Sequence, residues 1–440
     1  MSYERNLIIR HSIASVIALA VFGSTRFLYS VMISRRYGIE VLGSANSLIS
    51  QAFLLAIPLS FFAVALGKYS SEFLGRGDEE RIKSITSVAF FFPLLGLLII
   101  PFNAYIGLIS VLRALQLTVR NFFYGIHRGE VYAYAVLLAF AGFLAGFMGS
   151  GVYLPYLLFL GVMSAAAWAY LIKNRLVGRP GIRDIRLLIS YSSFAFLGTL
   201  SGVFLIQGPY FLSEKLGSAG IAGRVSASLS AAFLLTYLPQ VLQSAIMPLY
   251  SYKYGRDEME YVKNLSERLT KVLILTTAII VFLLLLFGRE VLSAFFGFSL
   301  GDEFYIALIA VEVYIAYNPS IVALSSTKYV QRASMVALLG AFASLVSWFF
   351  LIPSFGEYGT MMGLLVGYAL ILLGTAYVSM KTLGVSPSVY KPLLLAVILQ
   401  MPVFISKTAL AVAFLVFLVA LRGELLNLIN LIRLFRGRES

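Results

Sequence analysis

Long apolar segments follow one another along almost the whole chain, and they decide what it can fold into. Each is close to the roughly 20 residues that a helix needs to cross the hydrocarbon core of a bilayer. Within lipid every backbone polar group must be satisfied inside the protein, which leaves helices or a closed barrel. Continuous apolar runs, without the alternation typical of barrel strands, favour helices. The sequence therefore predicts an all-α integral membrane protein.

The composition agrees with a membrane protein. Of the 440 residues 60% are hydrophobic and 12% are charged, whereas a soluble domain carries about 25% charged residues. The net charge of +14 would suit nucleic acid in a soluble protein, but in a membrane protein it is explained by basic cytoplasmic loops. No nucleic-acid partner is expected. With no cysteine and two histidines, we expect no disulfide, no metal site and no cofactor.

About 14 transmembrane helices are predicted. The first apolar run continues to Ser34, which is too long for the apolar region of a cleavable signal peptide. The last two spans are short enough to form either full crossings or a re-entrant hairpin. The candidate spans cover residues 13–34, 42–66, 84–102, 104–124, 131–149, 152–172, 187–211, 221–249, 269–287, 304–325, 333–352, 359–380, 392–406 and 408–421.

Lysine and arginine residues indicate the orientation. About 26 of the 34 basic residues lie in the alternate loops and helix ends that share a side with both termini. The opposite loops hold about six, and Arg26 and Arg113 lie inside spans. Because cytoplasmic loops are enriched in basic residues, we predict a multi-pass protein of the cytoplasmic (cell) membrane with both termini in the cytoplasm.

The chain repeats itself at a separation of about 180 residues. Residues 52–55 and 232–235 both read AFLL, and each copy leads to a similar charged loop, GRGDEERIK at 75–83 and GRDEMEYVK at 255–263. Six spans separate the copies, so both have the same orientation and two six-helix lobes with a cavity between them are expected. Chance similarity of two apolar helices is the alternative, against which the matching polar loops argue.

The repeat predicts the domain organisation. Glycine pairs at GxxxG spacing, Gly142 with Gly146 and Gly363 with Gly367, indicate close helix packing within the lobes. The expected parts are an N-terminal lobe (1–175), a cytoplasmic linker (176–186), a C-terminal lobe (187–381), a C-terminal helical hairpin (391–421) and a cytoplasmic tail (422–440).

Polar residues recur inside the spans, where they are functional candidates by default. In the first span Arg26 shares one helical face with Gly23, Ser30 and Ser34. Such a face must look at protein or water, because lipid cannot satisfy it. The predicted substrate-cavity residues are Arg26, Asn46, Gln51, Arg113, Gln207, Arg224 and Gln243.

This set is basic and rich in amides. A guanidinium group matches phosphate oxygens two at a time, and amides suit sugar hydroxyls. Each residue has a structural alternative. Arg26 could pair with Glu312 or with backbone carbonyls, and Arg113 could lie at the periphery of its lobe. Arg224 could extend to the lipid headgroups, and amides also hold neighbouring helices together.

Glu312 is the carboxylate that the spans place near mid-membrane. It is the candidate for coupling transport to H⁺ or Na⁺, with a static ion pair as the alternative. The sequence has no GxxxxGK[ST] motif, so ATP hydrolysis is not expected. The outside loops are short and carry no paired carboxylates or histidine. We therefore predict that the chain is not an enzyme.

Four segments together resemble the multidrug/oligosaccharidyl-lipid/polysaccharide (MOP) exporter superfamily. With fourteen spans the chain is more similar to Wzx-type polysaccharide flippases and lipid II flippases than to the twelve-span MATE drug exporters. Its first span lacks the carboxylate that a resemblance to MATE antiporters would require. The segments are SRRYGIEVLGSANSL (34–48), NFFYGIHRGEVYAY (121–134), LFGREVLSAFFG (286–297) and LIPSFGEYGTMMGLLVGYAL (351–370).

The resemblance implies a flippase that moves a lipid-diphosphate-linked oligosaccharide to the outer leaflet by alternating access around a cationic central cavity. It also implies that the C-terminal hairpin helps to accommodate the lipid tail. The expected partners are this lipid-linked oligosaccharide, membrane lipids and either H⁺ or Na⁺, and we expect a monomer. Two other classes remain open, a MATE-like cation-coupled multidrug exporter and a membrane-embedded enzyme of polysaccharide assembly.

Overall fold

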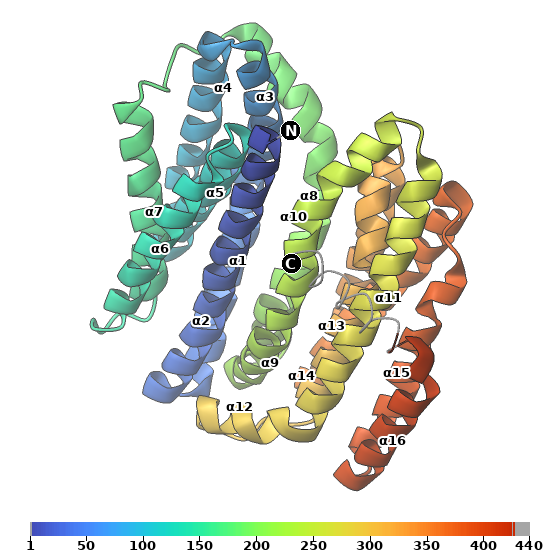
Figure 1. Ribbon diagram of the computed structural model, residues 1–440. Helices are drawn as coiled ribbons and strands as arrows, with labels where there is room; N and C mark the ends of the chain where they lie inside the picture. Colours follow the sequence, from blue (N-terminus) through green and yellow to red (C-terminus); the bar gives the residue numbers. More distant parts are fainter. Residues whose placement is uncertain (1, 425, 427–440) are drawn as a thin grey trace. The chain divides into compact units, whose positions relative to one another are not determined.

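The computed structural model describes residues 2–424 and 426, and this part of the chain is helical, with loops but no strand. The chain divides into two compact units, Met1–Ser226 and Ala227–Ser440, which we call unit 1 and unit 2. Figure 1 traces their helices in chain order. The lobe and linker boundaries expected from the repeat stay a prediction.

Unit 1 contains eight complete α-helices in its described residues and the first part of a ninth. They are α1 (Ser2–Tyr37), α2 (Ile39–Leu59), α3 (Ala63–Arg76), α4 (Glu79–Phe91), the 3₁₀ segment η1 (Phe92–Ile99), α5 (Ala104–Gly125), α6 (Gly129–Gly146), α7 (Leu154–Lys173), α8 (Ile182–Leu216) and α9 (Ala219–Ala232), which continues into unit 2.

Unit 2 continues from the second part of α9. Its elements are the 3₁₀ segment η2 (Phe233–Thr236), α10 (Tyr237–Gly255), α11 (Met259–Leu283), the π-helical turn η3 (Leu284–Gly288), α12 (Arg289–Phe296), α13 (Glu303–Ser325), α14 (Val330–Leu383), η4 (Pro387–Tyr390), α15 (Lys391–Gln400), η5 (Met401–Phe404) and α16 (Lys407–Ala420).

In unit 1 the helix α5 is central. It packs against α2, α3 and α7, while α2 also packs against α8 and α1 packs against α6. Side-chain caps define where two helices begin, because they satisfy backbone N–H groups that the first turn leaves free. Asn103 accepts from the N–H of Ile106 at the start of α5, and Asp78 accepts from the N–H of Arg81 at the start of α4.

The internal repeat is visible in the helix boundaries. Helices α2 and α9 begin at residues 39 and 219, and α4 and α11 begin at residues 79 and 259. The charged loops also match in backbone conformation, because Gly77 and Asp257 are both left-handed, with φ of 69° and 58°. The two copies of the repeat therefore begin these helices at corresponding residues.

The element α14 is a helical hairpin. Its 54 residues contain one non-helical position, Gly356, with φ 57° and ψ −126°. The two arms then pack face to face, since Ser344 donates to the carbonyl of Gly363 (2.9 Å) and Trp348 donates to that of Thr360 (2.8 Å). A side chain at Gly367 would collide with Ser344 and the backbone of Gly340, so the predicted close packing at this GxxxG pair is confirmed.

The same holds for the glycine pair of unit 1. A Cβ added at Gly146 would lie 2.5 Å from the Cα of Pro155, and one at Gly142 would lie 3.1 Å from Val162. Both contacts are between α6 and α7, which pack along their length. The predicted close packing at Gly142 and Gly146 is therefore also confirmed.

In unit 2 the helix α13 is buried almost throughout its length. It packs against α14, α11, α10 and α15. The C-terminal elements α15 and α16 pack against each other, and α15 also packs on α11 (Figure 1, red). The C-terminal hairpin predicted from the sequence thus consists of α15, η5 and α16.

The predicted fold class is confirmed, but the count of fourteen crossings is not. In the described residues, twelve helical segments are long and apolar enough to cross a membrane. One of the twelve is the whole of α14, whose two arms correspond to two predicted spans. The helix α16 has 14 residues and is shorter than a full crossing requires. The chain is a multi-span, all-helical membrane protein.

The matched loop positions of the repeat predict opposite stability changes. An L-residue in the left-handed region is strained, whereas glycine is not. We expect Gly77→Ala to lower the free energy of unfolding by about 1 kcal/mol and Asp257→Gly to raise it by a few tenths to about 1 kcal/mol. Thermal unfolding of the purified chain measures both.

The controls for this pair are Gly75→Ala and Gly255→Ala. Neither glycine has a left-handed φ, and a Cβ at either position meets open space. If Gly77→Ala were no more destabilising than Gly75→Ala, the left-handed conformation would not matter at this helix end.

Candidate functional site

The polar face of α1 packs against protein. Gly23, Ser30 and Ser34 are buried and Arg26 is partly buried. Ser30 accepts a hydrogen bond from Asn46 of α2 (3.3 Å). At these residues the face is in contact with protein, in line with the expectation that it looks at protein or water.

Arg26 lies where α1, α2 and α8 meet in unit 1. Its Nη1 donates to Oε1 of Gln207 (3.4 Å) and its Nη2 donates to Oγ of Ser50 (3.2 Å). Ser50 also donates to the same Gln207 oxygen (3.0 Å). The guanidinium carbon lies 4.1 Å from the ring centroid of Tyr210, a distance typical of a cation–π contact. The four groups come from three helices, and α8 lies more than 100 residues after α1 and α2 in the sequence.

The partners of Arg26 in unit 1 are neutral. They are an amide, a hydroxyl and an aromatic ring, and the Nε atom is buried without a hydrogen-bond partner. Among the described residues of unit 1, no carboxylate forms an ion pair with this guanidinium. A buried cation normally requires compensation by charge or by several hydrogen bonds. Arg26 therefore keeps uncompensated positive charge and an unused N–H donor.

Arg113 of unit 1 contacts two aromatic rings, one of them on the same helix as Arg26. Its guanidinium carbon is 4.7 Å from the ring centroid of Phe22, one turn before Arg26 on α1, and 4.6 Å from that of Phe53. Its Nη1 donates to Oε1 of Gln116 (2.5 Å). Phe53 in turn meets Tyr156 edge to face at 6.0 Å. The two arginines of the spans thus border one aromatic cluster in unit 1.

The two amides predicted on α2 differ in their surroundings. Asn46 is fully buried and donates to Ser30, while its Oδ1 atom is buried without a partner. Gln51 is only partly buried and donates to Ser47 of its own helix (3.3 Å). Of these two side chains only Asn46 connects α2 to the polar face of α1.

The three remaining predicted residues are on α9, α10 and α13. Arg224 is partly buried near the start of α9. The side chain of Gln243 lies outside the described part of the structure. Glu312 of unit 2 is buried on α13, where its Oε2 accepts from Nε2 of Gln400 (2.8 Å). The roles of all the predicted site residues stay predictions.

Sequence reasoning missed Ser50 and Tyr210. Both could have been found from helical spacing, because residues three or four apart share a face. Ser50 follows Asn46 by four residues, and Tyr210 follows Gln207 by three. Ser50 is a small hydroxyl and Tyr210 is a large aromatic residue, and neither stands out as polar in an apolar helix.

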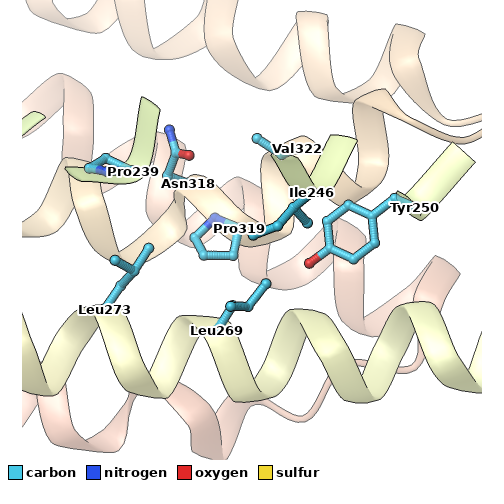
Figure 2. Close-up of a pocket in the computed structure, with 8 residues that line it drawn as sticks. All are labelled: Pro239, Ile246, Tyr250, Leu269, Leu273, Asn318, Pro319 and Val322. Carbon is cyan, nitrogen blue, oxygen red and sulfur yellow. The ribbon is translucent and has the colours of Figure 1, made fainter. Parts of the chain in front are cut away.

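Unit 2 contains a pocket with a mainly apolar lining. Figure 2 shows its lining from α10, α11 and α13, with the rings of Tyr250 and Pro319 and the amide of Asn318. It contains none of the predicted site residues. The residues that line it are Pro239, Ile246, Tyr250, Leu269, Leu273, Asn318, Pro319 and Val322.

Two solved structures share this architecture. The inward-facing form of a multidrug resistance MATE family transporter of the MOP superfamily is 12% identical, and the likeness covers 84% of this chain and 93% of that one, with a TM-score of 0.62. The chain has the fold of the MOP transporter superfamily. A MOP superfamily transporter from Pyrococcus furiosus has the same MOP fold at 14% identity, over 86% of this chain and 96% of that one, with a TM-score of 0.56.

One curated relative of this MOP-fold chain is a probable low-salt glycan biosynthesis flippase of Haloferax volcanii. It is 22% identical over 229 residues, which cover 49% of this chain and 46% of the relative. The match thus spans about half the length of that protein. No protein-family model matches the chain. The predicted resemblance to the MOP superfamily is confirmed at the level of the fold.

The hydrogen bonds of Gln207 predict that this side chain stabilises the folded chain. Replacing it by leucine removes the acceptor that Arg26 and Ser50 share, so the partly buried guanidinium of Arg26 and the buried hydroxyl of Ser50 each lose a partner. We expect Gln207→Leu to lower the free energy of unfolding by about 1–3 kcal/mol, measured as a fall in the thermal midpoint of the purified chain.

The matched control is Gln51→Leu, because that amide bonds only to its own helix. We expect it to change stability by less than about 1 kcal/mol. Equal losses in the two variants would mean that the Arg26–Ser50–Gln207 contacts do not hold α1, α2 and α8 together.

Proposed function

We propose that this chain is a flippase that moves a lipid-diphosphate-linked oligosaccharide across the cytoplasmic membrane. The observation that carries the proposal is the guanidinium of Arg26, held by neutral partners and with its Nε donor unused. A cation in a span is costly, and its retention is explained if it meets an anion during function. The diphosphate linker is such an anion.

The chemistry of the surrounding groups supports a phosphate ligand. The planar guanidinium binds phosphate oxygens in pairs, and a low dielectric strengthens the contact. Arg113 borders the same aromatic cluster and supplies a second positive charge. We propose that these two arginines engage the diphosphate, while Asn46, Gln51, Gln207, Gln243 and Arg224 contact the sugar or the headgroup region.

Two of the similar proteins bear on the proposal. The half-length match is to a protein named as a probable glycan biosynthesis flippase. The Pyrococcus furiosus transporter is described as having a binding pocket of reverse polarity that suggests a different function. Proteins of this fold thus differ in the polarity of their pockets, and the charges of this chain are the better guide to its substrate class.

The remaining parts of the mechanism follow from the repeat and from the basic loops. We propose two six-helix lobes that alternate access to a cationic central cavity, with both termini in the cytoplasm. The sugar head passes between the lobes while the lipid tail stays in the bilayer and contacts the C-terminal hairpin. Protons or Na⁺ drive the cycle, with Glu312 as the coupling residue of a monomeric protein.

Arg26 variants test the proposed function. In vesicles that contain the purified chain and a polyprenyl-diphosphate-linked oligosaccharide, we expect Arg26→Ala to slow flipping by about tenfold or more, because a charge-assisted bond to phosphate is lost. Arg26→Lys keeps the positive charge but loses the paired N–H donors of the guanidinium, so we expect an intermediate rate.

The matched control is Arg76→Ala, which removes an arginine from an exposed ion pair with Glu72. We expect it to flip at the normal rate. A neutral polyprenyl glycoside should show no dependence on Arg26. Full activity of both Arg26 variants on the diphosphate substrate would contradict the proposed role.

A second candidate function is MATE-like export of drugs, favoured by the multidrug transporters among the structures of the same fold. It predicts efflux of cationic dyes driven by an ion gradient. We expect no such efflux, because the charges of α1 and α5 would repel a cation. Robust gradient-driven dye export would favour this alternative. Formation of a new glycosidic bond from lipid-linked sugars and an acceptor would instead establish an enzyme of polysaccharide assembly.

A further inference from the structure

Gln400 is a buried polar residue at the end of an apolar helix. It ends α15, whose sequence KPLLLAVILQ is apolar from residue 392 to residue 399, and its side chain is fully buried. An amide in an apolar helix needs partners inside the protein. Its partner is Glu312 at the middle of α13, which is 1% exposed.

Glu312 and Gln400 share one hydrogen bond, but one oxygen atom of each side chain has no partner. Nε2 of Gln400 donates to Oε2 of Glu312 at 2.8 Å. The other oxygen of each group, Oε1 of Glu312 and Oε1 of Gln400, is buried with no hydrogen-bond partner. An ionised carboxylate and an amide oxygen are both acceptors only. Two unmet acceptors therefore belong to the two ends of one hydrogen-bonded pair.

A single proton on Glu312 would give both buried oxygens a hydrogen bond. A protonated carboxyl carries an O–H donor, which can donate to the amide oxygen while the amide N–H donates to the other carboxyl oxygen. Turning the amide of Gln400 by 180° would place its oxygen against Glu312 and would again require a proton there. We propose that Glu312 and Gln400 form a proton-binding site that locks the C-terminal hairpin of α15, η5 and α16 onto α13.

A basic side chain paired with Glu312 could take the place of the proton. In the described part of unit 2, Glu312 has no ion-pair partner, and Lys407 at the start of α16 pairs with Glu290. The elements that pack around α13 carry further charged or titratable side chains. They are Glu303, Tyr305, Tyr314 and Tyr317 on α13 itself, Arg332, Glu357, Tyr358, Tyr368, Tyr377 and Lys381 on α14, Tyr237, Tyr250, Tyr252, Lys253 and Tyr254 on α10, Glu260, Tyr261, Lys263, Glu267, Arg268 and Lys271 on α11, Tyr390 in η4 and Lys391 on α15.

The remaining contacts of the hairpin are mostly apolar and do not depend on pH. Phe404 meets Tyr305 with ring centroids 6.2 Å apart, and Phe414 stacks on Phe282 at 4.9 Å. In lipid such surfaces gain little from burial against protein, and polar groups supply specific association. Loss of the proton leaves a buried charge, so the docked hairpin is favoured at low pH and weakened as the pH rises.

The chain has no cysteine, so single cysteines can report docking. Ala396 lies four residues before Gln400 on the same helical face and is fully buried, while Ile405 is 84% exposed. The experiment measures maleimide labelling of Ala396→Cys in the purified full chain from mildly acidic to mildly alkaline pH. Each rate is divided by that of Ile405→Cys, which corrects for the reactivity of the thiol.

We expect the normalised rate to be low at acidic pH and to rise by about tenfold for each pH unit above the transition. Glu312→Gln mimics the protonated pair and should stay protected at every pH. The exchanged pair, Glu312→Gln with Gln400→Glu, restores one carboxyl and should restore the pH dependence. Replacing Na⁺ by K⁺ at constant pH should change nothing.

If the normalised labelling rate of Ala396→Cys does not change with pH while Glu312 is native, the proposal is overturned. Unchanged pH dependence in Glu312→Gln overturns it as well. A rate that follows Na⁺ rather than pH overturns the assignment to a proton. The assay uses no lipid-linked substrate, so its outcome is independent of whether unit 1 binds a diphosphate.

Discussion

The burial of the Arg26 guanidinium among neutral groups is the constraint around which unit 1 is organised. One amide oxygen, that of Gln207, accepts from both Arg26 and Ser50 and so connects α1, α2 and α8. The aromatic side chain of Tyr210 covers the charge without neutralising it. Such an arrangement is stable enough to persist and still leaves positive charge for a ligand.

Most of the fold could be predicted from the sequence, because the bilayer limits the choices. Apolar length predicted the helices. The predicted repeat of about 180 residues agrees with the observed helix starts at residues 39 and 219 and at 79 and 259. The count of fourteen crossings is left open by α16, which has 14 residues and is shorter than a full crossing requires. The two spans predicted at 333–352 and 359–380 are the arms of α14, which turns at Gly356. Helix length alone does not say whether a helix crosses.

The site was predicted less completely than the fold. Polar residues within apolar runs led to Arg26, Asn46 and Gln207, which the structure describes as buried or partly buried in unit 1. Their partners Ser50 and Tyr210 depend on how helices rotate against each other, which composition does not determine. The Glu312–Gln400 pair shows the same limit, since its two residues are 88 positions apart and meet only through packing.

Photo-crosslinking tests the central claim most directly, that Arg26 meets a diphosphate. The probe is a polyprenyl diphosphate with a photoreactive group beside the phosphates, irradiated with the purified chain in vesicles and mapped by mass spectrometry. We predict labelled peptides from α1 and α8 around Arg26 and Tyr210, with labelling lost in Arg26→Ala and absent when a neutral polyprenyl probe is used. Labelling that is confined to other helices, or that is unchanged in Arg26→Ala, would contradict the account.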